Sequence, residues 1–168
     1  MIAYTIGILG MLVIITGSLL MPSLFKSVLF LAGPALLALT AWMNGNRLFM
    51  ALQTVAISGA LLGFFNLKMD TTIILILVCA ILCIFWLYIA GELVKTENWI
   101  GIAGLVILSM GFASQHLSPT GDALLLVASV LISIFSTIDL LRGRREAWLW
   151  LILNLFFCLA GLVRIILA

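Results

Sequence analysis

The sequence predicts an all-α integral membrane protein with seven transmembrane helices, and composition, segment length and an internal repeat support this prediction. Of its 168 residues, 65% are hydrophobic and 8% are charged, and the mean hydropathy is +1.39. A soluble domain of this size needs a charged surface, which so few charges cannot provide. A bilayer solvates apolar surface instead, so lipid is the first expected partner.

The apolar residues fall into seven segments, each close to the length of about 20 residues that a helix needs to cross a bilayer. We expect helices over residues 2–21, 24–43, 48–65, 71–91, 99–113, 123–141 and 147–168. Polar residues, Pro or Gly separate them, as in the turn Asn44-Gly45-Asn46-Arg47. The first segment has no basic region before it, so we expect it to be retained as a helix rather than cleaved as a signal peptide.

Glycines indicate the repeat. Three glycines of the first segment recur in the fifth at a constant offset of 94 residues, so that Gly7, Gly10 and Gly17 match Gly101, Gly104 and Gly111. Matched glycines are informative because each removes a side chain from a defined point on the helix surface. Further along, Gly45 matches Gly143 at an offset of 98, and Gln53 matches Asn154 at an offset of 101.

This repeat predicts one transmembrane domain with three parts: a three-helix repeat over 1–70, a linker helix and loop over 71–98, and a second three-helix repeat over 99–168. The linker adds a fourth crossing, so both repeats enter the membrane from the same side, as parallel repeats about an axis along the membrane normal. The positive-inside rule orients the chain. Five basic residues are expected on the side of the N-terminus: Arg47, Lys95, Arg142, Arg144 and Arg145. Three are expected on the opposite side: Lys26, Lys68 and Arg164. We therefore expect a multi-pass protein of the cell inner (plasma) membrane with a cytoplasmic N-terminus.

A chain of three plus one plus three helices with glycine-marked parallel repeats resembles the SWEET sugar transporters and the PnuC-type vitamin transporters. The resemblance covers the whole chain as an architecture, and the expected orientation is the PnuC-like one. The Pro-Gln pair of the PQ-loop relatives is absent, because the first segment ends in Met21-Pro22-Ser23 and no proline precedes Gln53. The resemblance implies transport of a small polar solute (vitamin-, nucleoside- or sugar-like) and assigns no binding residue.

Polar residues at bilayer depth are costly, so each needs a partner or a function. Gln53 and Asn154 occupy matched positions and can bind substrate or clamp two helices together. Segment six carries Ser129, Ser133 and Ser136 on one helix face, which can line an aqueous path or pack against a neighbouring helix. Similar substrate contacts are possible at Thr40 and Trp42, near the end of segment two.

Three further features have two interpretations each. Asp139 can act as a coupling acid, although an ion pair with the nearby arginines is favoured. Pro34, in the middle of segment two, can be a hinge or a packing accommodation. Trp148 and Trp150 can stack on a ring-shaped substrate, but the five tryptophans together favour an aromatic belt at the membrane interfaces.

Other functions find no support in the sequence. Cys79, Cys83 and Cys158 are interpreted as small packing residues rather than metal ligands, and no enzyme motif or phosphate-binding loop occurs. We therefore expect no metal, no cofactor and no catalysis, and a net charge of +2 gives no indication of nucleic-acid binding. Transport is the favoured function, the alternative is a non-transporting membrane subunit or scaffold for a partner protein, and a channel formed by homo-oligomerisation lacks the expected ring of charges.

Overall fold

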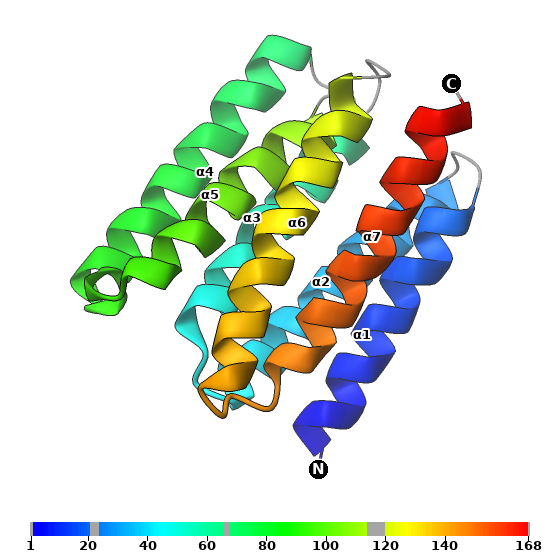
Figure 1. Ribbon diagram of the computed structural model, residues 1–168. Coiled ribbons are helices and arrows are strands. Elements are labelled where there is room, and N and C mark those ends of the chain that lie inside the picture. Colours follow the sequence, from blue (N-terminus) through cyan, green and yellow to red (C-terminus); the bar gives the residue numbers. More distant parts are fainter. Residues whose placement is uncertain (1, 21–23, 66–67, 114–119, 168) are drawn as a thin grey trace.

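The computed structural model describes residues 2–20, 24–65, 68–113 and 120–167, and within these ranges it contains seven α-helices (Figure 1). They are α1 (Ile2–Leu19), α2 (Leu24–Met43), α3 (Arg47–Phe64), α4 (Met69–Ile89), α5 (Thr96–Ala113), α6 (Thr120–Leu141) and α7 (Ala147–Leu167). A short 3-10 helix, η1 (Glu92–Val94), precedes α5. The prediction of an all-helical chain with seven helices is confirmed.

Four of these helices, α1, α2, α4 and α6, are long and apolar enough to cross a membrane. The remaining three are also apolar, but over the described residues their apolar stretches are shorter: Arg47–Leu62, Asn98–Gly111 and Ala147–Val163. The structure is therefore compatible with a membrane location.

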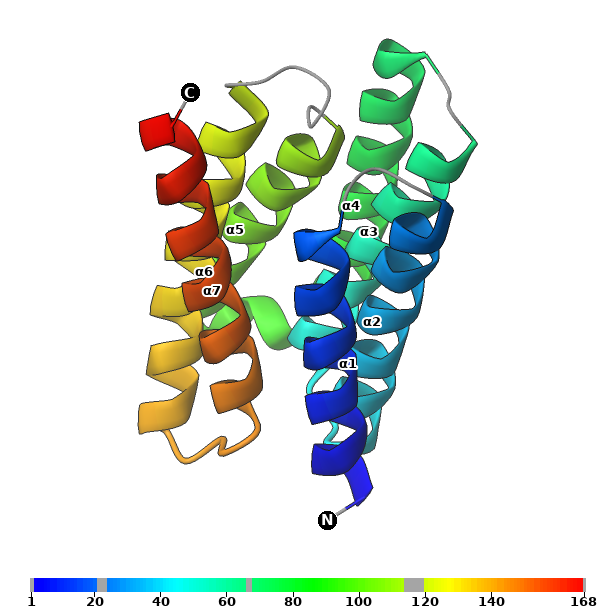
Figure 2. The same cartoon turned by 90° about the vertical axis from the view of Figure 1, so that its right-hand side faces the viewer.

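The helices form two groups of three, and each helix packs on the next one in its group. In the first group α2 lies against α1 and α3, and in the second α6 lies against α5 and α7 (Figure 2). Helix α4 packs on α3 and α5. The two groups also meet directly, since α3 contacts α5 and α1 contacts α7.

Two glycines lie at contacts between the groups. A β-carbon at Gly7 of α1 would lie 2.5 Å from Leu149 Cδ1 of α7, and one at Gly101 of α5 would lie 3.0 Å from Leu48 Cδ2 of α3. Gly101 follows Gly7 by 94 residues, and Leu149 follows Leu48 by 101 residues. The first helix of each group thus receives a leucine from the third helix of the other group.

Helices α2 and α6 end in the same glycine turn. Gly45 and Gly143 have φ angles of 66° and 86°, a region that favours glycine. The backbone N–H of Asn46 donates to Ala41 O at 2.8 Å, and that of Arg144 donates to Asp139 O at 3.1 Å. These are the wider of the two backbone hydrogen bonds that define a Schellman turn. The donor and the acceptor in the second turn each lie 98 residues after their counterparts in the first.

One expectation for the tryptophans was wrong. Trp42, Trp86 and Trp99 are exposed, as an interfacial belt requires, but Trp150 is only 1% exposed. It lies in the core because its ring stacks on Phe49, which is equally buried.

Candidate functional site

The buried polar residues lie in layers, starting from the end of the molecule that carries the N-terminus and the α2–α3 and α6–α7 turns (Figure 1). Five basic residues belong to the connections or helix ends at this end: Arg47, Lys95, Arg142, Arg144 and Arg145. The side chain of Arg164 lies outside the described residues.

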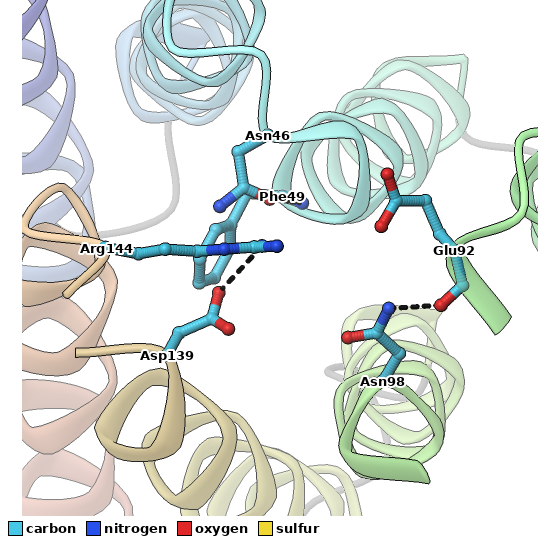
Figure 3. Close-up of polar contacts among 6 residues, drawn as sticks. All are labelled: Asn46, Phe49, Glu92, Asn98, Asp139 and Arg144. Carbon is cyan, nitrogen blue, oxygen red and sulfur yellow. Dashed lines mark hydrogen bonds and ion pairs between the residues drawn. The ribbon is translucent and has the colours of Figure 1, made fainter. Parts of the chain in front are cut away.

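The outermost layer is an ion pair beside an asparagine. Asp139, at the end of α6, is 2% exposed, and its Oδ2 lies 3.4 Å from Nη1 of Arg144, whose side chain is 33% exposed. Figure 3 shows Asn46 of the α2–α3 turn pointing toward this pair, and its buried Nδ2 has no hydrogen-bond partner among the described residues. Asn46 Oδ1 accepts a hydrogen bond from Phe49 N at 3.2 Å, as an N-cap of α3 does. Residues from both helix groups therefore meet here.

An aromatic layer follows directly. The rings of Phe49 on α3 and Trp150 on α7 are stacked, with centroids 4.0 Å apart and planes 14° from parallel. Phe135 of α6 packs against Phe49 at a tilt of 58°, with centroids 5.3 Å apart. The buried indole Nε1 of Trp150 has no hydrogen-bond partner among the described residues. Along α3 and α7 this layer lies between the polar groups at the helix starts and those one turn further in.

Gln53 and Asn154 lie one helical turn deeper. Gln53 follows Phe49 by four residues and Asn154 follows Trp150 by four, and both amides are buried. Asn154 Nδ2 donates to Trp150 O at 2.8 Å, which leaves its Oδ1 available. Gln53 is 8% exposed.

The serine face of α6 consists of Ser129, Ser133 and Ser136. All three hydroxyls are buried, and none has a hydrogen-bond partner among the described residues. Other helical hydroxyls in this protein donate to the carbonyl one turn back, for example Ser109 Oγ to Leu105 O at 2.8 Å and Thr137 Oγ1 to Ser133 O at 2.8 Å. Such back-bonding is the usual way for a helix to satisfy serine, so the serine face departs from the pattern of its own molecule.

The serine face belongs to one helix group only. Cys158 of α7 lies beside Ser133, but no hydrogen bond of acceptable geometry joins the thiol to the hydroxyl. This part of the serine face is therefore turned toward α7. The matching positions in α2, at the offset of 98, are Leu31, Ala35 and Ala38. The two groups therefore share their packing positions but differ in the polarity of this face.

Three predicted site residues are placed apart from these layers. Thr40 Oγ1 donates to Leu36 O at 3.0 Å and to Ala3 O at 3.2 Å, which ties α2 to α1. Trp42 is 67% exposed at the end of α2. Pro34 is buried within an unbroken α2, beside the point where Gly33 contacts Ile14 and Gly10 of α1.

Two side chains brace the connection between α4 and α5. The buried Asn98 donates from Nδ2 to Glu92 O (Figure 3), and Arg47 Nη1 donates to Ala90 O at 3.1 Å. The sequence predicts that the fifth helix begins at residue 99, after a loop that ends at Asn98, but the structure begins α5 at Thr96, because this hydrogen bond folds η1 onto the start of the helix.

Sequence reasoning did not select Asn46, Phe49 or Arg144 as site residues, although a signal was present. Phe49 and Trp150 are separated by 101 residues, the offset that links Gln53 with Asn154. Asn46 and Arg144 are separated by 98, the offset of the turn glycines. Each pair occupies matched positions, and their differing residue types hid the match.

Comparison with known proteins adds no relative, because no family model, no curated protein and no solved structure matches this chain. Among the described residues, no group of three or more His, Cys, Asp or Glu side chains is placed to hold a metal ion.

Proposed function

We propose that this protein is a membrane transporter or facilitator of a small polar solute that binds inside the helix bundle, against the serine face of α6. The observation that carries the proposal is the serine face, with three buried hydroxyls that lack partners among the described residues. A buried polar group left without a partner costs about 1–3 kcal/mol. A passing solute and its accompanying water would supply the missing partners.

The membrane setting rests on the outer surface of the helices. Helix α4 alone exposes six large apolar side chains along its middle: Ile74, Leu75, Val78, Ile81, Leu82 and Phe85. Patches of this size on soluble proteins are covered by a partner, whereas a bilayer covers them with lipid. We propose that all seven helices cross the inner (plasma) membrane and that the arginine-rich end, with the N-terminus, is cytoplasmic.

A duplicated architecture of two parallel three-helix repeats joined by α4 is part of the same proposal. Two independent contacts support it, namely the exchange of leucines at Gly7 and Gly101 and the matching glycine turns at Gly45 and Gly143. Carriers built from repeats bind their substrates at the repeat interface near the bilayer midplane. Gln53 and Asn154, one turn below the aromatic layer, are the groups expected there.

The conformation described here would be a closed one. The serine face, Gln53 and Asn154 are all buried, so a solute reaches them only when the helices around them move apart. Their hydroxyl and amide groups carry no formal charge at neutral pH, and they suit a solute that is bound through hydrogen bonds, as a vitamin, nucleoside or sugar would be.

Thermal unfolding of the purified protein against a panel of vitamins, nucleosides and sugars tests this function. A ligand that binds the folded state raises the Tm, by an amount that grows with its concentration. We expect a stabilising compound to lose its effect on the variant Ser133→Ala/Ser136→Ala and to keep it on Ser109→Ala, whose hydroxyl is satisfied within its own helix.

A membrane subunit that holds a partner protein is the competing function. It would be favoured if no compound in the panel raised the Tm and the protein were isolated only together with another chain. Stable purification of the chain alone, with a ligand-dependent Tm, would exclude it.

A further inference from the structure

We propose that Phe49 and Trp150 form a gate that closes the solute path at the end of the molecule carrying the N-terminus. This inference rests on the proposed transport function, because a gate requires a path. It adds a defined point of closure and the helix movement that opens it.

The stack joins the two helix groups. Phe49 belongs to α3 of the first group and Trp150 to α7 of the second, and their centroids are 4.0 Å apart. Phe135 of α6 closes a further side at 5.3 Å from Phe49. All three rings are fully buried. Separating α3 from α7 would therefore pull the stack apart.

The stack also lies between two polar layers. On the outer side are Asn46, Asp139 and Arg144 (Figure 3), and on the inner side, one turn along each helix, are Gln53 and Asn154. A solute that moves between the N-terminal end and the inner amides has to pass the rings. The unpartnered indole N–H of Trp150 offers it a hydrogen bond on the way.

Opening the stack would leave the neighbouring ion pair intact. Asp139 and Arg144 both belong to the second helix group, at the end of α6 and in the α6–α7 turn. When α3 and α7 part, the pair moves as a unit, away from Asn46 of the first group. Stacked rings interact over a broad surface without fixed donors and acceptors, so they can separate and close again without exchanging hydrogen bonds.

Thiol accessibility tests the gate. In a background with Cys79, Cys83 and Cys158 replaced by Ala, Ser133→Cys places a single thiol on the inner side of the rings. A membrane-impermeant, cationic methanethiosulfonate reagent is applied to sealed vesicles, first on the face carrying the N-terminus and then on the opposite face. We expect Phe49→Ala and Trp150→Ala to raise the labelling rate from the N-terminal face at least tenfold and to leave the rate from the opposite face unchanged.

Two further variants separate gating from general loosening. Phe157→Ala removes a partly buried ring from the same helix as Trp150, away from the stack, and should leave both rates at the parent level. Phe49→Leu keeps an apolar side chain in place but removes the ring, so that a folded protein with a weakened stack remains available if an alanine variant fails to fold. It should also raise labelling from the N-terminal face.

The outcomes distinguish the gate from the transport function. Equal acceleration by Phe157→Ala, or equal acceleration from both faces, would overturn the gate and leave the path in place. If the thiol at position 133 stayed unlabelled from both faces in every folded variant, no aqueous path would exist and both proposals would fail.

Discussion

Leu149 of α7 occupies the space that a side chain on Gly7 of α1 would fill, since a β-carbon at Gly7 would lie 2.5 Å from Leu149 Cδ1. Leu48 of α3 bears the same relation to Gly101 of α5 at 3.0 Å. In the proposed membrane setting no hydrophobic effect operates between helices, and close packing at small residues contributes to their association. The stability of this protein is therefore expected to depend strongly on its helical glycines.

The helical glycines differ in the room that they leave for an added methyl group. A β-carbon at Gly10 would lie 3.0 Å from the backbone oxygen of Gly33, whereas at Gly161 the nearest atom, Leu126 Cβ, is 3.5 Å away. We expect Gly10→Ala to lower the free energy of unfolding by about 1–3 kcal/mol, because a backbone oxygen cannot move aside as a side chain can. Gly161→Ala should be neutral or slightly stabilising, and denaturation in detergent would measure both. Equal losses would show that the close approach at Gly10 has no special importance.

The serine face predicts a conflict between stability and function. Ser136→Ala removes a buried hydroxyl that has no partner among the described residues, so the free energy of unfolding should rise by about 1 kcal/mol. Ser109→Ala removes a hydroxyl bonded to Leu105 O and should bring no gain. Thermal unfolding of the two variants without ligand makes the comparison. A destabilised Ser136→Ala would mean that this hydroxyl has a partner in the resting protein.

The Asp139–Arg144 pair predicts an asymmetric response to mutation. Arg144→Gln leaves a buried carboxylate without its counter-ion, whereas Asp139→Asn leaves an arginine that is one-third exposed and reaches water. Removing one partner of a fully buried pair costs about 3–5 kcal/mol, and a surface pair is worth about 0–1 kcal/mol. We expect Arg144→Gln to fall between these limits and Asp139→Asn to cost less. The double variant should recover much of the stability that Arg144→Gln loses. A double-mutant cycle on the Tm is the measurement, and if the pair did not interact, the two single variants would lower the Tm equally and their effects would add in the double variant.

Asn46 predicts a local effect on α3. Its side chain caps the helix through Phe49 N at 3.2 Å, so Asn46→Ala should lower the free energy of unfolding by about 1 kcal/mol. Asn46→Ser retains a capping oxygen and is the matched control. Chemical denaturation of both variants would test the cap, and identical values for serine and alanine would contradict it.

The sequence predicted the helices well because apolar runs and their polar breaks follow directly from composition. All seven predicted segments correspond to helices, and each boundary lies within three residues of the expected one. The glycine offsets also held information about packing. The offset of 94 between Gly7 and Gly101, and the offset of 101 first noted at Gln53, reappear in the leucines that these glycines receive.

The candidate site was less accessible to sequence reasoning. Trp150 was assigned to the interface because tryptophans at span ends usually lie there, yet the ring of Phe49 holds it in the core. A sequence of apolar helices does not reveal which face of each helix turns inward, so the aromatic layer could not be foreseen. The same limit applies to Ser129, Ser133 and Ser136, whose spacing fixed a common face but not their lack of partners.

The tight turns after α2 and α6 also bear on how the chain is assembled during synthesis. Each turn fixes the path between two consecutive helices through backbone hydrogen bonds that span at most six residues. Helix α2 packs extensively on α1 and α3, and α6 packs extensively on α5 and α7. These contacts also join helices that leave the ribosome one after the other. Contacts that are close in sequence form quickly. In the proposed membrane setting, each helix pair can therefore enter the bilayer already folded back on itself, whereas the docking of Leu149 at Gly7 has to await the synthesis of α7.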